Sequence, residues 1–240
     1  MERIKDFQLL LFGFILGLAL IICVIIGVNN LSRNGIEVTG AANKTVTSDY
    51  ATWHSEITVK ASSLKNGYNE LSDYSKKFTD YLTAQGFSKD EIMMQKIAQN
   101  PVYIKNSNGY DTNKIDYYNF IQPIDVQSKD INKITETSLS SQKLLTEGIN
   151  FNSYNPQYFY TPLDTIKVEL LKDASNNAKQ RAQAMIKSTG NNVGHITSSK
   201  MGVFQITPIN STDVSDYGIN DTSSIKKKVT AVVQVKFAIE

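Results

Sequence analysis

Cysteine and histidine are scarce in this 240-residue chain, and each scarcity excludes a class of protein or site. One cysteine cannot form an intramolecular disulfide, which excludes the disulfide-stabilised small secreted domains. Two histidines and one thiol are too few for a zinc site made of Cys and His ligands alone. A net charge of +2 lacks the strong basic excess of nucleic-acid-binding domains, so no nucleic-acid partner is expected.

Motifs of common enzyme classes are also missing. The chain contains no Gly-x-Ser-x-Gly elbow and no glycine-rich phosphate-binding loop. We therefore predict that the protein is not an enzyme, and we assign no catalytic residue, no metal and no cofactor. A hydrolase built on scattered carboxylates such as Asp49 and Asp173 is the least favoured alternative.

Long apolar runs are confined to the start of the chain. Leu9–Val28 carries no charge, and about 20 apolar residues match a bilayer core of about 30 Å. Its length, and the lack of an Ala-x-Ala site after it, favour an uncleaved signal anchor over a signal peptide. Arg3 and Lys5 precede it and only Arg33 follows closely, so the N-terminus is predicted to be cytoplasmic. We expect a single-pass cell-membrane protein whose residues 7–28 contact the lipid bilayer.

Four segments follow from this interpretation. We predict a short cytoplasmic tail over 1–6, a transmembrane signal-anchor helix over 7–28, a linker over 29–35 and an extracytoplasmic domain over 36–240.

Alternation of apolar and polar residues predicts strands in the predicted outer domain. Residues 36–41 alternate, and residues 51–62 place Trp53 and Ile57 on one face and His54 and Glu56 on the other. Extended segments are also expected over 92–104, 117–126, 149–160 and 193–206, with a hairpin tip at 106–114. Residues 229–239 alternate to the end of the chain and predict a strand inside the sheet.

Three helices are expected between these strands. The first begins at Ser62 or Ser63, ends at Gly86 and carries an apolar stripe. The second covers 130–146. The third covers 163–189, before Gly190, and has an alanine-rich stripe. The stripe of the first helix comprises Leu64, Tyr68, Leu71, Phe78 and Leu82. The stripe of the third helix comprises Leu171, Ala174, Ala178, Ala182 and Met185. The predicted fold class is α+β, with antiparallel β-sheets and about three amphipathic helices, preceded by one N-terminal transmembrane helix.

Several short motifs resemble those of the SIMPL-domain family. Ile36-x-Val38-x-Gly40-x-Ala42 resembles its opening strand, and Asp49 with Ala51 resembles the following turn. Asp173-Ala174, Ala178, Ala182 and Gly190 resemble its alanine-rich helix, and Val229-x-Ala231-x-Val233-x-Val235-x-Phe237 its closing strand. Ser48 departs from the proline often found before that aspartate. The resemblance implies an α+β fold outside the cytoplasm, with some members similar to subunits of ring- or channel-like oligomers and others linked to oxidative-stress defence.

An aromatic cluster is the best candidate for an interaction surface. It comprises Tyr154, Tyr158, Phe159 and Tyr160, although core packing is the alternative role for these side chains. His54, Lys226–Lys228 and the loop aspartates Asp213, Asp216 and Asp221 are expected to be solvated surface groups.

Assembly is the predicted function. We expect the protein to act by homo-oligomeric assembly or by binding an envelope protein partner, and the resemblance implies a link to stress defence. The alternative is a ligand- or stress-sensing ectodomain that works with a membrane partner.

Overall fold

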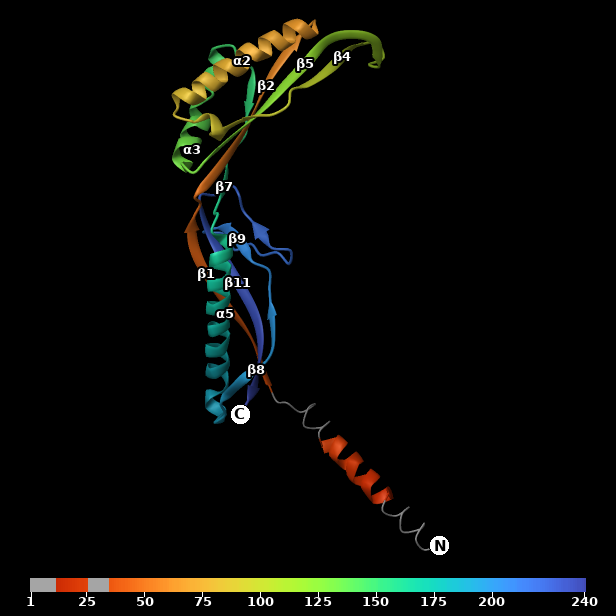
Figure 1. Cartoon of the computed structure of the whole chain (residues 1–240), viewed down its shortest axis with the longest axis vertical. Coiled ribbons are helices and arrows are strands. Elements are labelled where there is room, and N and C mark those ends of the chain that lie inside the picture. The colour runs from red at the N-terminus through yellow and green to blue at the C-terminus, as the bar shows by residue number, and fades with distance from the viewer. Residues whose placement is uncertain (1–11, 26–34) are drawn as a thin grey trace. The chain divides into compact units, whose positions relative to one another are not determined.

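The computed structural model describes residues 12–25 and 35–240 as helices, strands and their connections (Figure 1). Residues 12–25 are helical. The strands of 35–240 are β1 (Gly35–Thr47), β2 (Tyr50–Ala61), β3 (Ile92–Met94), β4 (Ala98–Lys105), β5 (Asp111–Ser128), β6 (Phe151–Ser153), β7 (Gln157–Phe159), β8 (Val193–Met201), β9 (Gln205–Pro208), β10 (Ile219–Asn220) and β11 (Lys226–Ile239). The α-helices of this range are α2 (Leu64–Ala84), α3 (Ile131–Ser140), α4 (Lys143–Thr146) and α5 (Leu163–Ile186), with 3-10 turns at Lys89–Glu91 and Lys187–Thr189. The α+β class is therefore confirmed.

The structure contradicts the predicted membrane anchor. Within residues 12–25 and 35–240, no helix is both long and apolar enough to cross a membrane. The predicted transmembrane helix over 7–28, and the cell-membrane location that rested on it, are corrected accordingly. Residues 7–11 and 26–28 of that prediction, the tail 1–6 and the linker residues 29–34 lie outside the described residues.

The strands form two sheets. The first has the order β1-β11-β9-β10, with β8 also paired to β11, and its short β9–β10 pair is parallel. The second has the order β3-β5-β2-β6, with β4 also paired to β5 and β7 to β2, and all of its pairs are antiparallel. The first sheet is therefore mixed, so the predicted antiparallel pairing does not hold for β9 and β10, and β11 has neighbours on both sides, as predicted for the closing strand.

The chain forms two compact units, which we describe separately. Unit 1 comprises Met1–Asn43, Lys167–Phe204 and Thr230–Glu240, and unit 2 comprises Lys44–Ile166 and Gln205–Val229.

In unit 1, helix α5 packs against strands through a stripe of small residues. Ala174, Ala178 and Ala182 are completely buried. Met185 was predicted to belong to the same stripe, but it is 62% exposed. The neighbouring helix positions Leu170 and Ile186 are buried instead. The buried strand residues of unit 1 are Val38, Ala231, Val233, Val235 and Phe237.

Gly40 sets how closely β1 approaches α5. A Cβ atom at this position would overlap the Ala174 carbonyl oxygen and lie 2.6 Å from the Ala178 nitrogen. The Asn177 side-chain oxygen accepts a hydrogen bond from the Ala41 N–H (3.2 Å), and Arg181 donates to the Thr39 carbonyl (3.1 Å). Because glycine and alanine remove bulk from both surfaces, these backbone groups come within reach of helix side chains.

In unit 2, one face of the second sheet supports the core. Strand β2 pairs with β5 over its whole length except its first residue, from Ala51 opposite Ser128 to Ala61 opposite Tyr118. Trp53 and Ile57 are completely buried with Leu71 and Phe78 of α2. Alternate residues of a strand point to opposite faces, so the residues between them on β2 form the other, polar face.

Helix α2 begins and ends as predicted, and Leu71, Phe78 and Leu82 of its predicted stripe are completely buried, but the first two members of the stripe are not. The Ser63 hydroxyl caps its N-terminus by accepting a hydrogen bond from the Asn66 N–H (3.3 Å), and Gly86 follows it with φ = +87°. Leu64 and Tyr68, which we expected on the buried side, are 49% and 56% exposed.

Candidate functional site

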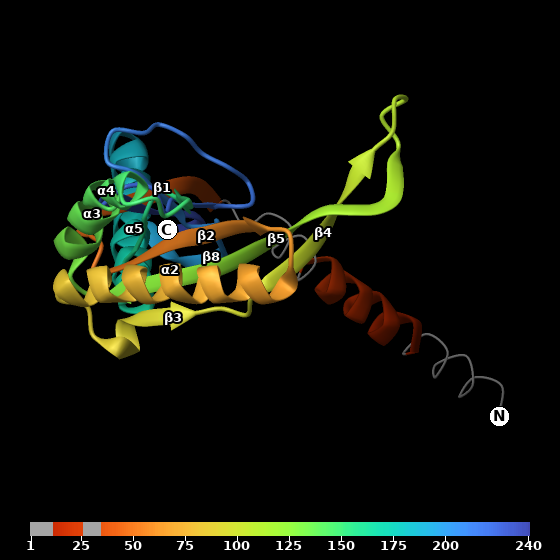
Figure 2. The same cartoon turned by 90° about the horizontal axis from the view of Figure 1, so that it is seen from above.

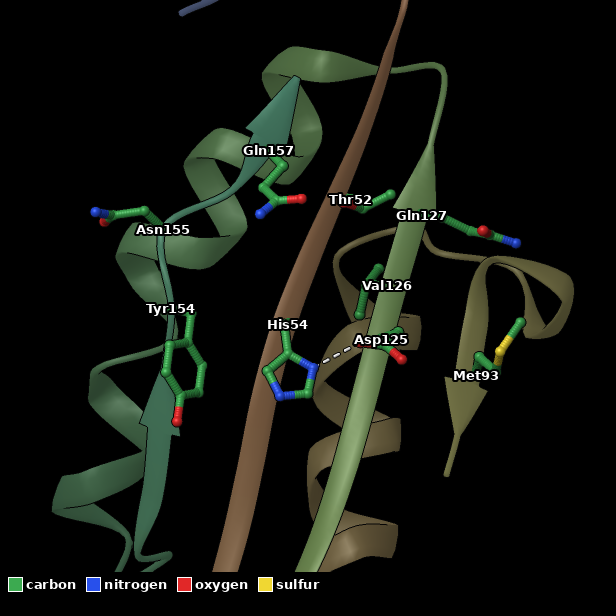
Figure 3. Close-up of a pocket in the computed structure, with 9 residues that line it drawn as sticks. All are labelled: Thr52, His54, Met93, Asp125, Val126, Gln127, Tyr154, Asn155 and Gln157. Carbon is green, nitrogen blue, oxygen red and sulfur yellow. Dashed lines mark hydrogen bonds and ion pairs between the residues drawn. The ribbon is translucent and has the colours of Figure 1, made fainter. Parts of the chain in front are cut away.

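A groove of about 520 Å³ lies on the polar face of the second sheet in unit 2 (Figure 3). Its walls come from β2, β3, β5, β7 and the connection between β6 and β7. The lining residues are Thr52, His54, Met93, Asp125, Val126, Gln127, Tyr154, Asn155 and Gln157.

His54 is the centre of a polar network in this groove. Register places His54 of β2 directly opposite Asp125 of β5, and its Nδ1 lies 2.6 Å from Asp125 Oδ1. On the other side of the ring, Nε2 lies 3.5 Å from Glu56 Oε1. Gln95 extends the network by donating a hydrogen bond to Asp125 Oδ2 (2.8 Å). The imidazole is therefore positioned by two carboxylates from neighbouring strands.

Tyr154 forms the aromatic wall of the groove. Its ring lies beside the imidazole of His54, with a centroid separation of 5.1 Å and an interplanar angle of 41° (Figure 3). The Tyr154 backbone N–H donates to the His54 carbonyl (3.1 Å), and its hydroxyl donates to Glu56 Oε2 (3.3 Å). The negative charge of Glu56, followed by desolvation and this hydrogen bond, raises the pKa of the Tyr154 hydroxyl.

The lining of the groove contains few nucleophilic side chains. Thr52 is the only aliphatic hydroxyl among its lining residues, and none of them is a cysteine or lysine. Within the part of the chain that the structure describes, no group of three His, Cys, Asp or Glu residues is arranged to hold a metal ion. What the groove offers is carboxylate and imidazole acceptors beside an aromatic ring.

The structure separates the four residues of the predicted aromatic cluster. Tyr154 is 48% exposed and lines the groove, whereas Tyr158 is buried and its hydroxyl is 2.9 Å from that of Thr135. Phe159 is half-buried against Tyr50, with ring centroids 6.5 Å apart, and Tyr160 is half-buried. A role of the cluster in interaction remains a prediction, and among its members Tyr154 is the most accessible.

A second exposed surface is the end of the β4–β5 hairpin, which we name the hairpin arm (residues 102–117). Strand β2 ends at Ala61, opposite Tyr118, so β5 continues beyond it with only β4 as a neighbour. Figure 2 shows this hairpin extending past the end of α2. Its exposed apolar side chains are Tyr103, Ile104, Tyr110 and Ile115, and Tyr103 lies opposite Ile115 on the ladder.

Asp221 and Lys227 have defined partners, contrary to the expectation of simple solvation, whereas Asp213, Asp216 and Lys226 are exposed as expected. Lys227 is only 2% exposed, and its Nζ lies 3.3 Å from Asp221 Oδ2 and 2.5 Å from the Asp221 carbonyl oxygen. Burial opposes ionisation of Asp221, but hydrogen bonds from Ser224 and Ser223 and the charge of Lys227 hold the pKa of that carboxyl well below its usual range. Burial lowers the pKa of the Lys227 ammonium.

Asp49 has two hydrogen-bond partners, whereas His195 has one distant ionic partner. Asp49 accepts hydrogen bonds from the Thr161 N–H and hydroxyl, both at 2.7 Å, and thus ties two distant segments together. His195 is exposed, with Nδ1 3.8 Å from a Glu240 carboxylate oxygen.

Sequence reasoning missed Asp125 and Gln95 as parts of the site. They are 71 and 41 positions from His54, and only strand pairing brings them together. Alternation along residues 120–128 places Asp125 on the polar face of its strand, but the partner strand and its register are not visible in that pattern.

Comparison with protein families gives one match. Residues 36–237 match the family described as SIMPL, protein of unknown function (DUF541). The chain belongs to the SIMPL family. This confirms the resemblance seen in the opening strand, the alanine-rich helix and the closing strand. Comparison with curated proteins gives no significant match for this SIMPL protein.

Proposed function

We propose that this SIMPL protein is an assembly module whose hairpin arm contacts a second copy of the chain. The observation that supports the proposal is the exposure of apolar side chains on a two-stranded ribbon. Both strands of the arm are exposed along most of their length, whereas the other half of β5 alternates between buried and half-buried residues.

An isolated two-stranded hairpin is marginally stable in water. In the arm, Tyr103 is 37% and Ile115 is 42% exposed, and cross-strand partners share one face of a sheet. Fully burying one such side chain contributes about 1.5–3 kcal/mol relative to leaving it exposed. Contact with another protein surface would thus stabilise the arm as well as the assembly.

The arm is better suited to contact through its faces than through its edge. Among the described residues, β4 has only β5 as a neighbouring strand, and it carries Pro101, which lacks a backbone N–H. Register shifts follow at Val102–Tyr103 and Tyr103–Lys105. Bulges and proline both discourage strand addition at an edge, which leaves the Tyr103–Ile115 face as the contact surface.

The proposal is tested by the mass of the full chain in solution, measured by light scattering over a range of concentrations. We expect wild type to be oligomeric and the double variant Tyr103→Ser/Ile115→Thr to have a lower mass at the same concentration. Leu139→Gln is the matched control, because Leu139 is 69% exposed on α3 outside the arm. A monomeric wild type at every concentration, or an arm variant with wild-type mass, contradicts the proposal.

Ligand binding is a second candidate function, because the His54 groove combines converging polar groups with an aromatic wall. The role in stress defence stays a prediction of the family resemblance.

A further inference from the structure

His54 Nε2 and a carboxylate oxygen of Glu56 face each other beside the groove, and Glu56 itself is not one of the nine lining residues. Asp125 Oδ1 lies 2.6 Å from Nδ1 on the other side of the ring, and because a carboxylate can only accept, Nδ1 donates this hydrogen bond. A neutral imidazole has only one N–H, which leaves Nε2 as an acceptor. Nε2 points toward Glu56 Oε1, a carboxylate acceptor 3.5 Å away. A neutral ring therefore leaves this pair without a donor between its two atoms.

The surroundings favour a positively charged donor. The two carboxylates of the network belong to Asp125 and Glu56, and none of the nine lining residues is lysine or arginine. The Tyr154 ring stands beside His54 at 5.1 Å, and its hydroxyl already donates to the second oxygen of Glu56. Cations are attracted to aromatic faces within about 6 Å, so Tyr154 adds to the attraction of Glu56.

The groove is large enough for more than a single ion. Its volume of about 520 Å³ falls in the range of small-molecule sites. Asn155 and Gln157 line the part away from Asp125 and provide amide groups for a polar but uncharged portion of a ligand (Figure 3).

We propose that this groove binds a small organic cation with an ammonium or guanidinium group. The N–H groups of the cation donate to Glu56 Oε1 and His54 Nε2, and the charge lies against the Tyr154 ring. Asp125 holds the imidazole in the tautomer that accepts at Nε2. This site is independent of the hairpin arm, because no residue of 102–117 lines the groove.

Calorimetric titration of the full chain with agmatine tests the proposal, with butylurea as an uncharged probe of similar shape. We expect agmatine to bind and butylurea not to bind. Glu56→Gln should weaken agmatine binding at least about tenfold, because it removes the charge and keeps the shape. Tyr154→Leu should weaken it by less. Glu136→Gln, an exposed carboxylate of α3 outside the groove, is the matched control and should leave binding unchanged.

A second measurement places the ligand at His54. In nitrogen-detected NMR of the full chain, agmatine should shift the Nε2 resonance of His54 and leave that of the exposed His195 unchanged. Lack of binding, equal binding of butylurea, or wild-type affinity in Glu56→Gln overturns the proposal.

An ammonium or guanidinium group can come from a free small molecule or from a protein side chain. Comparing the affinity of agmatine with that of a blocked Gly-Arg-Gly tripeptide distinguishes these two sources. Tighter binding of agmatine assigns a free small molecule, and tighter binding of the tripeptide assigns an arginine side chain of a partner. Retained agmatine binding in Tyr103→Ser/Ile115→Thr is expected, so failure of the assembly proposal and failure of this one are distinguishable.

Discussion

Replacing Gly40 with alanine tests the close approach of β1 and α5 in unit 1. The added Cβ would overlap the Ala174 carbonyl oxygen and lie 2.6 Å from the nitrogen and 2.8 Å from the Cβ of Ala178. Two of these three atoms belong to the helix backbone, which cannot rotate away as a side chain can. Overpacking of a well-packed core costs about 1–3 kcal/mol, and a clash with backbone favours the upper end.

The expected loss of about 3 kcal/mol corresponds to a decrease in Tm of roughly 6–12 °C for a protein of this size. Calorimetry or urea unfolding of the full chain measures it. Gly202→Ala is the control, because the nearest atom to its added Cβ is the Val232 oxygen at 3.2 Å, and we expect a much smaller change. Adding Ala178→Gly to Gly40→Ala should restore only part of the loss, because the overlap with Ala174 persists. If Gly40→Ala unfolds within about 0.5 kcal/mol of wild type, the proposed role of Gly40 is refuted.

Three further substitutions test unit 2, each by urea unfolding of the full chain. Asp221→Asn leaves the buried Lys227 ammonium without its counter-charge and should cost about 3–5 kcal/mol, whereas adding Lys227→Met should recover most of this loss; equal stability of the single and double variants would contradict the ion-pair argument. Burial opposes ionisation of Glu91, but hydrogen bonds from Ser128, Ser88 and Lys133 lower the pKa of its carboxyl from 4.5 to about 2, so its stabilisation is present above pH 4.5 and is lost as the pH falls toward 2. The stability difference between wild type and Glu91→Gln should therefore shrink over that interval, and a constant difference would oppose the assignment. Ser63→Ala removes the N-cap of α2 and should cost about 1 kcal/mol, with Ser62→Ala, one residue earlier, as the unchanged control.

Local pattern accounts for most of the elements. The period of two in β2 and β11, and the glycines with positive φ at 86 and 190, follow from the preferences of individual residues and their neighbours. The boundaries of α2 follow from the same kind of signal. The burial of individual side chains does not follow from local pattern. Leu64 and Met185 are apolar and could belong to a core, but both lie on the exposed sides of their helices.

The membrane anchor shows a different limit of pattern. An uncharged run at Leu9–Val28 meets the length criterion in the sequence, yet no helix within the described residues meets it in the structure.

The sequence alone determined the scarcity of cysteine and histidine, the α+β class, most strand and helix positions and membership of the SIMPL family. Only tertiary structure brought Asp125 and Gln95 to His54 and placed Tyr154, but not Tyr158, beside the same ring. The physical reason is the range of the interactions. Alternation and capping depend on residues a few positions apart, whereas a binding groove depends on the register between strands that lie about seventy positions apart.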